Sequence, residues 1–418
     1  MPRSILILGS GIAGPPLASF LLLSPLPVHE LPHITILERR TKSDLDKGQN
    51  IDIRGTGEEG CQFVDDKSRT WASFAADKTG KIQTGTSDIE ILRGRLGKIL
   101  AERFQALSED VKKEGGKGID FLFGDYVQEL TEIAGGVAVK FAKSGKTRKF
   151  DIVIGADGLQ SRTRRMVWGE SGEDERLFRI GMYGGFFSMP RGATDSEWRR
   201  WFHTSGRRGI MVRPSDELDT TTVFMHVMNH HDPRLEEVAR DGRRGEQAQT
   251  ALLAEYVQNA GWECSRVVKE MEASNDFYYD MVAQVKMPKW AKSRVALLGE
   301  AGYCASPISG MGTTLALNGA YSLAGALVRH PDDHLAAFEE YEATMRPLVD
   351  RAQKLPLGGK APYILNPETG RCVQVLHVVL GFICWSDVAN LIARFAGPPA
   401  NAVPVREYGF RQASEWTE

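Results

Sequence analysis

Three features of the sequence predict an α/β protein made of two interleaved domains. A short apolar run near the N-terminus is interrupted by regularly spaced glycines. Apolar residues alternate through the middle of the chain, and a helix of small residues follows a glycine-rich stretch near residue 300. A chain of 418 residues is also longer than one ordinary hydrophobic core. We therefore expect two domains.

The composition excludes several classes of protein. A charged fraction of 25% with a net charge of −2 lacks the basic excess of a nucleic-acid surface. The apolar run 372–385 is shorter than a membrane span of about 20 residues and predicts a buried or domain-bridging helix, so we expect no integral membrane segment.

The cysteines form no CxxC pair and are odd in number; they are Cys61, Cys264, Cys304, Cys372 and Cys384. We expect reduced thiols, no metal site and a cytoplasmic location. Because a strand begins at Ser4, we expect no targeting segment.

The first element in chain order is a strand–turn–helix–strand unit. SILILGSGIAGPPLASFLLL predicts a strand over 4–9, the pattern G-x-G-x-x-G, and a helix from about 13 to 23. A second strand, HITILERR, ends on an acid. In a Rossmann-like unit such glycines make a tight turn, admit a pyrophosphate and let the helix pack closely, while the acid accepts ribose hydroxyls. The pattern predicts a dinucleotide site and leaves FAD and NAD open; its residues are Gly9, Gly11, Ile12, Ala13, Gly14 and Glu38.

Two later motifs favour a flavin. DIVIGADGLQSRTR, 151–164, is a strand that runs into Asp157-Gly158, and alone it is equally well an ordinary turn. GEAGYCASPISGMG, 299–312, places Glu300 at a strand end, before a loop and the start of a helix. A flavin needs an acidic acceptor for its ribitol hydroxyls. It also needs backbone N–H groups for the charge on its reduced ring, and glycines permit that approach.

These motifs, in this order and spacing, resemble the class A flavoprotein monooxygenases, the p-hydroxybenzoate hydroxylase-like group. NIDIRGTGEEG, 50–60, and IEILRGRLGKIL, 89–100, look like the branch that contains the tetracycline-degrading monooxygenase and fungal aromatic and polyketide hydroxylases. The similarity extends over about 4–330 and is weak between 176 and 280. The family normally has Asp where this chain has Glu300, which keeps the carboxylate and adds one methylene.

The resemblance implies a set of cofactor contacts. Glu38 matches the ribose-binding acid, and the loop over the flavin ring matches 307–312. The Asp157-Gly158 motif implies contact with FAD and, transiently, with NADPH. The remaining implied cofactor residues are Arg39, Asp52, Arg93, Arg164, Pro307, Gly310, Met311 and Gly312.

The resemblance also implies an activity. It is NAD(P)H-dependent hydroxylation of a small aromatic or polyketide-like molecule by O2, through a flavin C4a-hydroperoxide, in secondary metabolism or degradation. NADPH is expected to dock transiently, with NADH open, because no second G-x-G-x-x-G follows a strand. Epoxidation, oxidative decarboxylation, dehydrogenation and a non-catalytic FAD-binding role are the alternatives. We expect a monomer or a homodimer.

The middle of the chain predicts strands of a mixed sheet that, by the resemblance, covers the flavin and carries the substrate pocket. Alternation places Phe224 and His226 on one face and Val223 and Met225 on the other. Substrate candidates are Met211, Arg213, Phe224, His226 and Pro307, and the two candidates for a catalytic role are Arg213 and His226. Ordinary core packing is the alternative for each strand residue.

The predicted domains follow from these elements. Residues 1–175 and 290–330 form the FAD-binding domain, and 176–289 are inserted into it as the substrate domain. Residues 246–259 predict an amphipathic helix within the insertion. Residues 331–418 predict helices, over 336–353 and 372–396, that brace the two domains.

Overall fold

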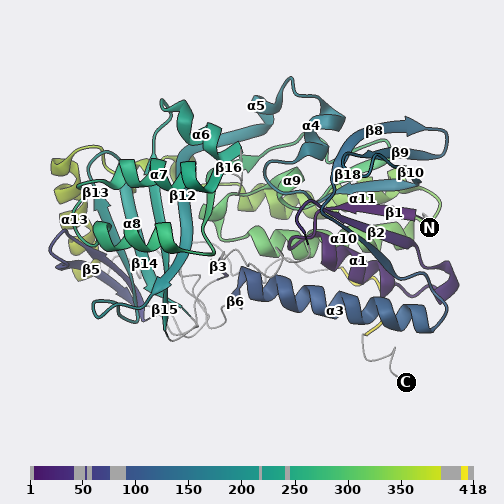
Figure 1. The fold of residues 1–418 in the computed structure, drawn as a ribbon, viewed down its shortest axis with the longest axis horizontal. Helices are drawn as coiled ribbons and strands as arrows, with labels where there is room; N and C mark the ends of the chain where they lie inside the picture. Colours follow the sequence, from purple (N-terminus) through teal and green to yellow (C-terminus); the bar gives the residue numbers. More distant parts are fainter. Residues whose placement is uncertain are drawn as a thin grey trace.

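The computed structural model describes residues 4–41, 52–53, 59–75, 91–215, 219–240, 245–386 and 406–412. Two sheets lie at opposite ends of an elongated molecule (Figure 1). Helices α10 and α11 lie beside the six-stranded sheet, and the paired strands β3 (Asp52–Ile53) and β6 (Ile91–Leu92) lie between the two sheets. The predicted α/β class is confirmed.

The first sheet has six strands. Their order is β17 (Ala291–Lys292), β18 (Val295–Leu297), β11 (Ile152–Gly155), β1 (Ser4–Leu8), β2 (His33–Glu38) and β7 (Ile119–Phe123). All neighbours are parallel except β17 and β18. Because parallel strands end at the same edge, the turns after β1, β2, β11 and β18 meet there.

Both faces of this sheet are covered, which explains the continuous apolar runs of its strands. Ile5 and Ile7 pack with residues of α1 (Gly14–Leu22), α3 (Arg93–Lys113) and α10 (Gly312–Arg329). Leu6 and Leu8 pack against the three-stranded sheet of β8 (Val127–Ile133), β9 (Gly136–Phe141) and β10 (Thr147–Phe150). The connecting elements are η1 (Val28–Glu30), α4 (Arg162–Trp168), α5 (Glu173–Arg176), α9 (Glu300–Tyr303) and η3 (Pro307–Ser309).

The second sheet is mixed and has seven strands. Their order is β16 (Tyr278–Val285), β12 (Leu177–Pro190), β15 (Thr220–Met228), β14 (Arg208–Pro214), β13 (Trp198–Thr204), β4 (Gly60–Val64) and β5 (Thr70–Ala75). Strands β4 and β5 come from the part of the chain that we assigned to the flavin domain, and β4 pairs in parallel with β13. The sheet therefore extends beyond 176–289, because a strand's sequence indicates its type but not its partner.

Helices α6 (Pro233–Arg240), α7 (Glu246–Val257) and α8 (Cys264–Ala273) pack on one face of this sheet. Val223 and Met225 point into that core, together with Leu252 and Leu253 of α7. Phe224 belongs to a separate cluster on the other face. The predicted alternation in β15 is confirmed, and so is the helix predicted over 246–259, which ends two residues earlier, at Val257.

The C-terminal helices run from one sheet toward the other. Helix α11 (His334–Ala352) packs on α10, and η4 (Pro356–Gly359) and α12 (Ala361–Leu365) follow. Helix α13 (Gly370–Trp385) packs on β5 and β13, so within the described residues its main contacts are with the seven-stranded sheet. Positions 387–396 of the predicted second helix lie outside the described residues. None of the helices in the described ranges combines the length and the apolar character that crossing a bilayer requires.

Candidate functional site: the carboxyl edge of the six-stranded sheet

The turn after β1 depends on its glycines in two different ways. Gly9 has φ +112°, and a Cβ there would lie 2.4 Å from the Ala156 carbonyl oxygen. A Cβ on Gly14 would lie 2.2 Å from the Gly9 oxygen and 3.2 Å from Ile7. A Cβ on Gly11 would meet no atom within 4 Å. Packing explains the first two glycines, whereas Gly11 borders open space of the kind that a pyrophosphate would fill.

Helix α1 starts at this turn, and the residue before it, Ala13, lies close to Gly299 of the third motif. Ile12 and Ala13 are buried, and Pro15 and Pro16 occupy the first helical turn. Prolines are tolerated there because those N–H groups have no intrahelical partner. A Cβ on Gly299, which precedes Glu300, would lie 3.1 Å from the Ala13 Cβ. The first and the last predicted motifs therefore touch.

The acid at the end of β2 is fully engaged. Ser10 N donates to one Glu38 oxygen at 2.9 Å, and Arg40 donates to the other from its backbone N at 2.9 Å and from Nε at 3.1 Å. Burial opposes the charge, but Arg40 and the backbone donors outweigh it and hold the pKa of Glu38 below its usual range. Arg40 is the arginine that pairs with Glu38. Arg39, the predicted cofactor contact, is exposed.

The acid of the second motif forms a cap for α4. Thr163 donates to the Asp157 carboxylate from N and Oγ1, each at 2.9 Å, and Ser161 Oγ donates at 2.6 Å. Ser161 in turn accepts from Arg164 N at 2.9 Å. Gly158 follows with φ +76°, a conformation that favours glycine. The motif thus holds a fixed turn at the strand edge.

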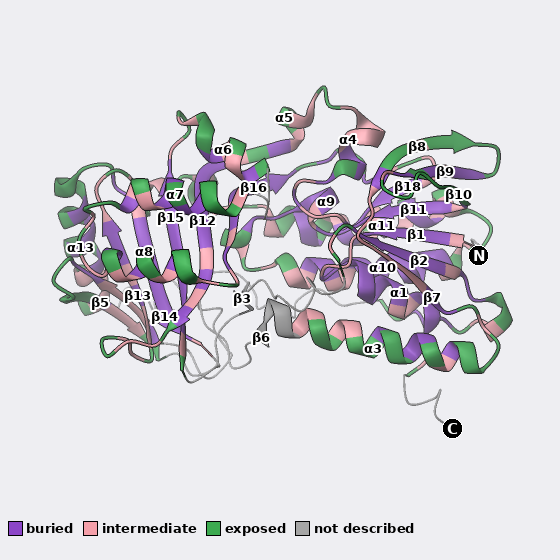
Figure 2. Cartoon of the chain, in the orientation of Figure 1, coloured by how far each residue is buried: buried purple, intermediate pink, exposed green. Residues whose placement is uncertain are grey.

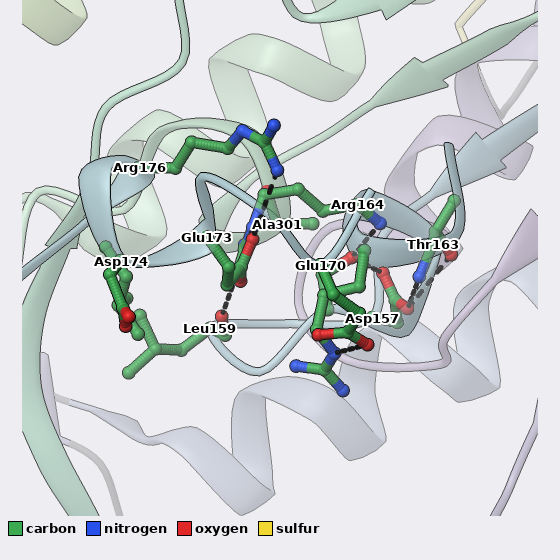
Figure 3. Close-up of polar contacts among 12 residues, drawn as sticks. Asp157, Leu159, Thr163, Arg164, Glu170, Glu173, Asp174, Arg176 and Ala301 are labelled. Atoms are coloured by element: carbon green, nitrogen blue, oxygen red, sulfur yellow. Dashed lines mark hydrogen bonds and ion pairs between the residues drawn. The ribbon is translucent and has the colours of Figure 1, made fainter. Parts of the chain in front are cut away.

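Arg164 is wholly buried, and Figure 3 shows its side chain among Glu173, Leu159 and Ala301. Its Nη1 donates to Ala301 O and its Nη2 to Leu159 O, both at 2.9 Å. Its Nε donates to Glu173 at 3.0 and 3.2 Å. With 0% of its surface exposed, Arg164 is a positioning residue, because it ties the turn after β11 to the residue that follows Glu300.

Glu300 stands between the second and third motifs. A Cβ on Gly158 would lie 3.9 Å from one of its carboxylate oxygens, and a Cβ on Gly312 would lie 4.0 Å from the other. The carboxylate has no hydrogen bond or ion pair with any other residue in the described part of the chain. A half-buried acid with no protein partner, flanked by two glycines, can accept hydrogen bonds from a ligand.

The loop before α10 is exposed and holds a strained residue. Pro307, Gly310 and Gly312 are exposed, Met311 is half-buried, and the first residue of α10 is Gly312. Ser306 has φ 73° and ψ 154°, a region that is almost restricted to glycine. It is buried, and its Oγ has no hydrogen-bond partner among the described residues.

Two predicted cofactor residues cannot be placed in full. Asp52 lies in β3 and Arg93 begins α3, but their side chains lie outside the described residues.

The substrate candidates lie on the face of the seven-stranded sheet opposite α7. Met211 is directly opposite Phe224 in the register, and Arg213 is opposite Thr222. Phe224 stacks on Phe186 with centroids 4.2 Å apart, and Trp201 meets its edge at 6.3 Å. Pro307, the fifth candidate, belongs to the loop at the other sheet. We call the rings of Phe186, Trp201, Phe224 and His226 the aromatic floor.

Two glycines let two of these rings pack closely on neighbouring strands. A Cβ on Gly184 would lie 2.5 Å from the Phe224 ring, and one on Gly209 would lie 2.5 Å from His226. The two rings therefore rest on the backbones of neighbouring strands. His226 Nε2 lies 2.6 Å from Asn366 Oδ1, and burial lowers the pKa of His226 to about 4. A buried, neutral histidine held by an amide is a weak candidate for proton transfer at neutral pH.

Several contributors were not predicted. Arg40 follows the predicted Arg39, and Glu173 lies nine residues after Arg164; charged residues of opposite sign this close in sequence are too common to single out either one. No local sequence pattern marks the other three residues. Ser306 is strained, Gly209 lies close to a ring, and Asn366 contacts a residue 140 positions away, and all three features arise only on folding.

The site fits FAD. Open space at Gly11 would take the pyrophosphate, and the Glu38 turn is placed for the ribose. The unpaired Glu300 carboxylate, beside glycines and the start of α10, is placed for the ribitol and the ring.

Comparison with known proteins agrees with this assignment. The chain matches the FAD binding domain family over residues 105–353. The FAD-dependent monooxygenase asL6 of Sarocladium schorii is 33% identical over 416 residues, which cover 94% of this chain and 95% of that protein. Monooxygenase CTB7 of Cercospora beticola is 30% identical and covers 98% of each chain.

The fold is also that of solved flavoproteins. The crystal structure of the tetracycline destructase Tet(51) superposes with a TM-score of 0.71 at 27% identity, covering 98% of this chain and 100% of that one. Klebsiella pneumoniae HpxO, solved with FAD and uric acid, has a TM-score of 0.63 at 18% identity and shares the fold. This protein therefore belongs to the class A FAD-dependent monooxygenases of the FAD binding domain family.

Proposed function

We propose that this monooxygenase uses NADPH or NADH, together with O2, to hydroxylate a small planar aromatic or polyketide-like substrate. The single observation that carries the cofactor half of the proposal is the unpaired Glu300 carboxylate between Gly158 and Gly312. Bound FAD would supply the redox chemistry, taking electrons from the nicotinamide and activating O2. The protein's own residues would hold the ring, orient the substrate and exclude water.

The aromatic floor supports a planar substrate. Phe186 and Phe224 are within 17° of parallel, and Phe224 and His226 within 18°. Phe224 and His226 are buried within this stack, whereas Phe186 and Trp201 are half-buried, so these two rings are the ones that could contact a flat ring system. The name of the tetracycline destructase gives tetracycline as the target of that protein, and supports the polyketide-like class here.

Arg213 and Thr222 extend the floor with polar groups. The Arg213 side chain is 2% exposed, and the Thr222 hydroxyl opposite it has no hydrogen-bond partner in the described ranges. A buried guanidinium beside a hydroxyl suits an acidic oxygen, such as a carboxylate or an enolate. Arg213 also has an interaction partner within the protein, and we propose it for substrate orientation rather than for proton transfer.

The deciding experiment is anaerobic reduction of the FAD-loaded protein by NADPH and by NADH, followed by stopped-flow absorbance, with and without phenolic and polyketide-like compounds. We expect the flavin bands to bleach, and faster with one compound class. Glu300→Gln should lower FAD affinity at least tenfold, whereas Glu300→Asp should retain it. Bands that never bleach with either nucleotide would refute nicotinamide dependence.

Product mass then separates the reactions. A gain of one oxygen supports hydroxylation or epoxidation, and loss of two hydrogens indicates dehydrogenation. Loss of carbon dioxide indicates oxidative decarboxylation. Full FAD retention by both Gly11→Asp and Arg93→Ala would refute the cofactor contacts that we assign to these residues.

A further inference from the structure

Strand β16 is the edge strand of the seven-stranded sheet that lies nearest to α9 and η3 (Figure 1). We call residues 304–306, between α9 and η3, the linker. It connects the helix that starts with Glu300 to the exposed loop before α10. Residues 281–285 of β16 and the whole linker are buried (Figure 2). Val285 N donates to Cys304 O at 3.0 Å, so the strand and the linker are joined backbone to backbone.

Two glutamines reinforce this junction with their side chains. Gln284 of β16 is 1% exposed, and its Nε2 donates to Ala305 O at 3.1 Å and to Gln353 O at 3.0 Å. Gln353 caps the end of α11, and its Nε2 donates to Val285 O at 2.7 Å and to Cys304 O at 3.0 Å. These bonds tie the substrate sheet, the linker and the end of α11 together.

The junction explains how the linker keeps its strained residue. Ser306 has φ 73° and ψ 154°. Such a conformation persists only where the surrounding structure fixes it. The Ala305 carbonyl belongs to the peptide unit that leads into Ser306, so the bond from Gln284 fixes the orientation of that unit. The glutamines therefore hold the linker in a conformation that its own backbone disfavours.

The Gln284 amide is oriented for donation. Both atoms that face its Nε2 are carbonyl oxygens, so only the NH2 end of the amide can point at them. Its Oε1 is buried and has no hydrogen-bond partner among the described residues. An apolar side chain would avoid the cost of that unpaired oxygen. The position of the donor therefore explains this residue better than a contribution to stability does.

Gln284 also lies on the substrate face of the sheet. Successive residues of a strand point to opposite faces, so Gln284 shares its face with Val282. Val282 packs in the cluster that contains the substrate candidates Met211 and Phe224. Ala283 packs in the core on the other face. Gln284 thus stands between the substrate face and the linker.

We propose that Gln284 and Gln353 are positioning residues that fix the linker, and with it Glu300 and the loop before α10, relative to the substrate face. The inference rests on the proposed function, because it takes this loop as part of the FAD site. A displacement of β16 by a bound substrate would reach the cofactor through these bonds. Loss of a donor would let the linker relax, weaken FAD binding and change the surroundings of the flavin.

The test compares Gln284→Met and Gln353→Met with the matched control Gln249→Met. Methionine keeps the length of the side chain and removes the donor. Gln249 is a buried glutamine of α7, on the other face of the same sheet, and its Nε2 donates to Val238 O at 2.6 Å. Melting temperature checks that each variant is folded. Gln353 is half-buried at a helix end, so its variant carries the test if Gln284→Met does not fold.

Three measurements report on the junction. They are FAD titration of the apoprotein, visible circular dichroism of bound FAD at saturation, and hydrogen–deuterium exchange of the FAD-loaded chain. We expect both junction variants to raise the FAD Kd about fivefold, to change the dichroism and to speed exchange over 304–312. The control should change none of them, even if it melts earlier. Junction variants that leave all three unchanged, or equal changes in the control, would overturn the proposal.

A double-mutant cycle tests the link to the substrate face. Val282→Ala removes two methyl groups from the cluster that contains Phe224, and should speed exchange over 304–312 in the wild type but add nothing in Gln284→Met. No effect in the wild type, or an equal effect in both backgrounds, would overturn this link. None of these measurements uses a nicotinamide or a substrate. Failure of NADPH and NADH to reduce the flavin would therefore refute the proposed function separately.

Discussion

The two sheets carry two different kinds of binding surface. At the carboxyl edge of the six-stranded sheet the ligand side consists of backbone, glycines and one unpaired acid, as at Gly11, Gly158 and Glu300. On the seven-stranded sheet it consists of large rings that lie on neighbouring strands. A single carbon atom added to a glycine of the first surface would obstruct ligand binding there. The second surface can be reshaped by substituting its side chains. This difference suits a constant cofactor and a variable substrate.

The largest expected change in stability comes from comparing substitutions at two glycines of the same turn. Gly9→Ala forces a Cβ to 2.4 Å from the Ala156 oxygen at a left-handed φ, and should cost at least about 4 kcal/mol of unfolding free energy. Gly11→Ala meets nothing and should leave the apoprotein within about 0.5 kcal/mol of the wild type. Urea unfolding of the apoproteins measures both.

Only the second variant should then lose FAD without loss of stability, because its methyl group enters the space of the pyrophosphate. If Gly11→Ala keeps full FAD, this space is not the cofactor site.

The next effect compares two adjacent arginines of α4. Arg164→Met removes a wholly buried guanidinium from Glu173 and should cost about 3–5 kcal/mol. Arg165→Met breaks a 3.5 Å pair with Glu170, whose side chain is 80% exposed, and should cost less than about 1 kcal/mol. Chemical unfolding at neutral pH gives both values, and equal costs would contradict the positioning role of Arg164.

The substrate sheet should respond to mild acid. Burial lowers the pKa of His203 to about 3, with His226 and His377 adding to the shift, and that of His226 to about 4. Between pH 6.5 and 4.5 these two histidines are protonated in the unfolded chain and remain neutral in the folded chain. Stability should therefore fall with falling pH, by up to about 1.4 kcal/mol per pH unit for each histidine.

Unfolding curves at stepped pH measure this slope. His203→Phe should reduce it, while the exposed His29→Gln should leave it unchanged. Glu38, whose pKa is depressed, loses its contribution only as pH falls through its usual value of 4.5, which is the lower edge of this window. An unchanged slope in His203→Phe would refute the assignment.

The smallest effect is at Ser306. Ser306→Gly relieves about 1–3 kcal/mol of backbone strain in the folded state. The added conformational entropy of the unfolded chain opposes this by up to about 1 kcal/mol, so we expect the free energy of unfolding to rise by about 1 kcal/mol. Thermal unfolding of the apoprotein tests it. A loss of stability would instead assign the buried hydroxyl a bonding role.

The sequence by itself determined the parallel sheet and the order of its turns. Glycine spacing, apolar runs and terminal acids are local patterns, and parallel strands bring their ends together wherever the chain goes in between. That is why residues as distant as Gly9, Glu38, Gly158 and Glu300 could be predicted to share one edge. The alternation of β15 and the helix over 246–257 were readable for the same reason.

Only the tertiary structure decided which residues surround those patterns. The pairing of β4 with β13, the ring of His226 over Gly209 and the bond to Asn366 depend on contacts between distant segments. Arg164 matched a cofactor motif, and its burial shows that it acts through the protein. Local sequence encodes backbone conformation, whereas partners and burial follow from how the whole chain packs.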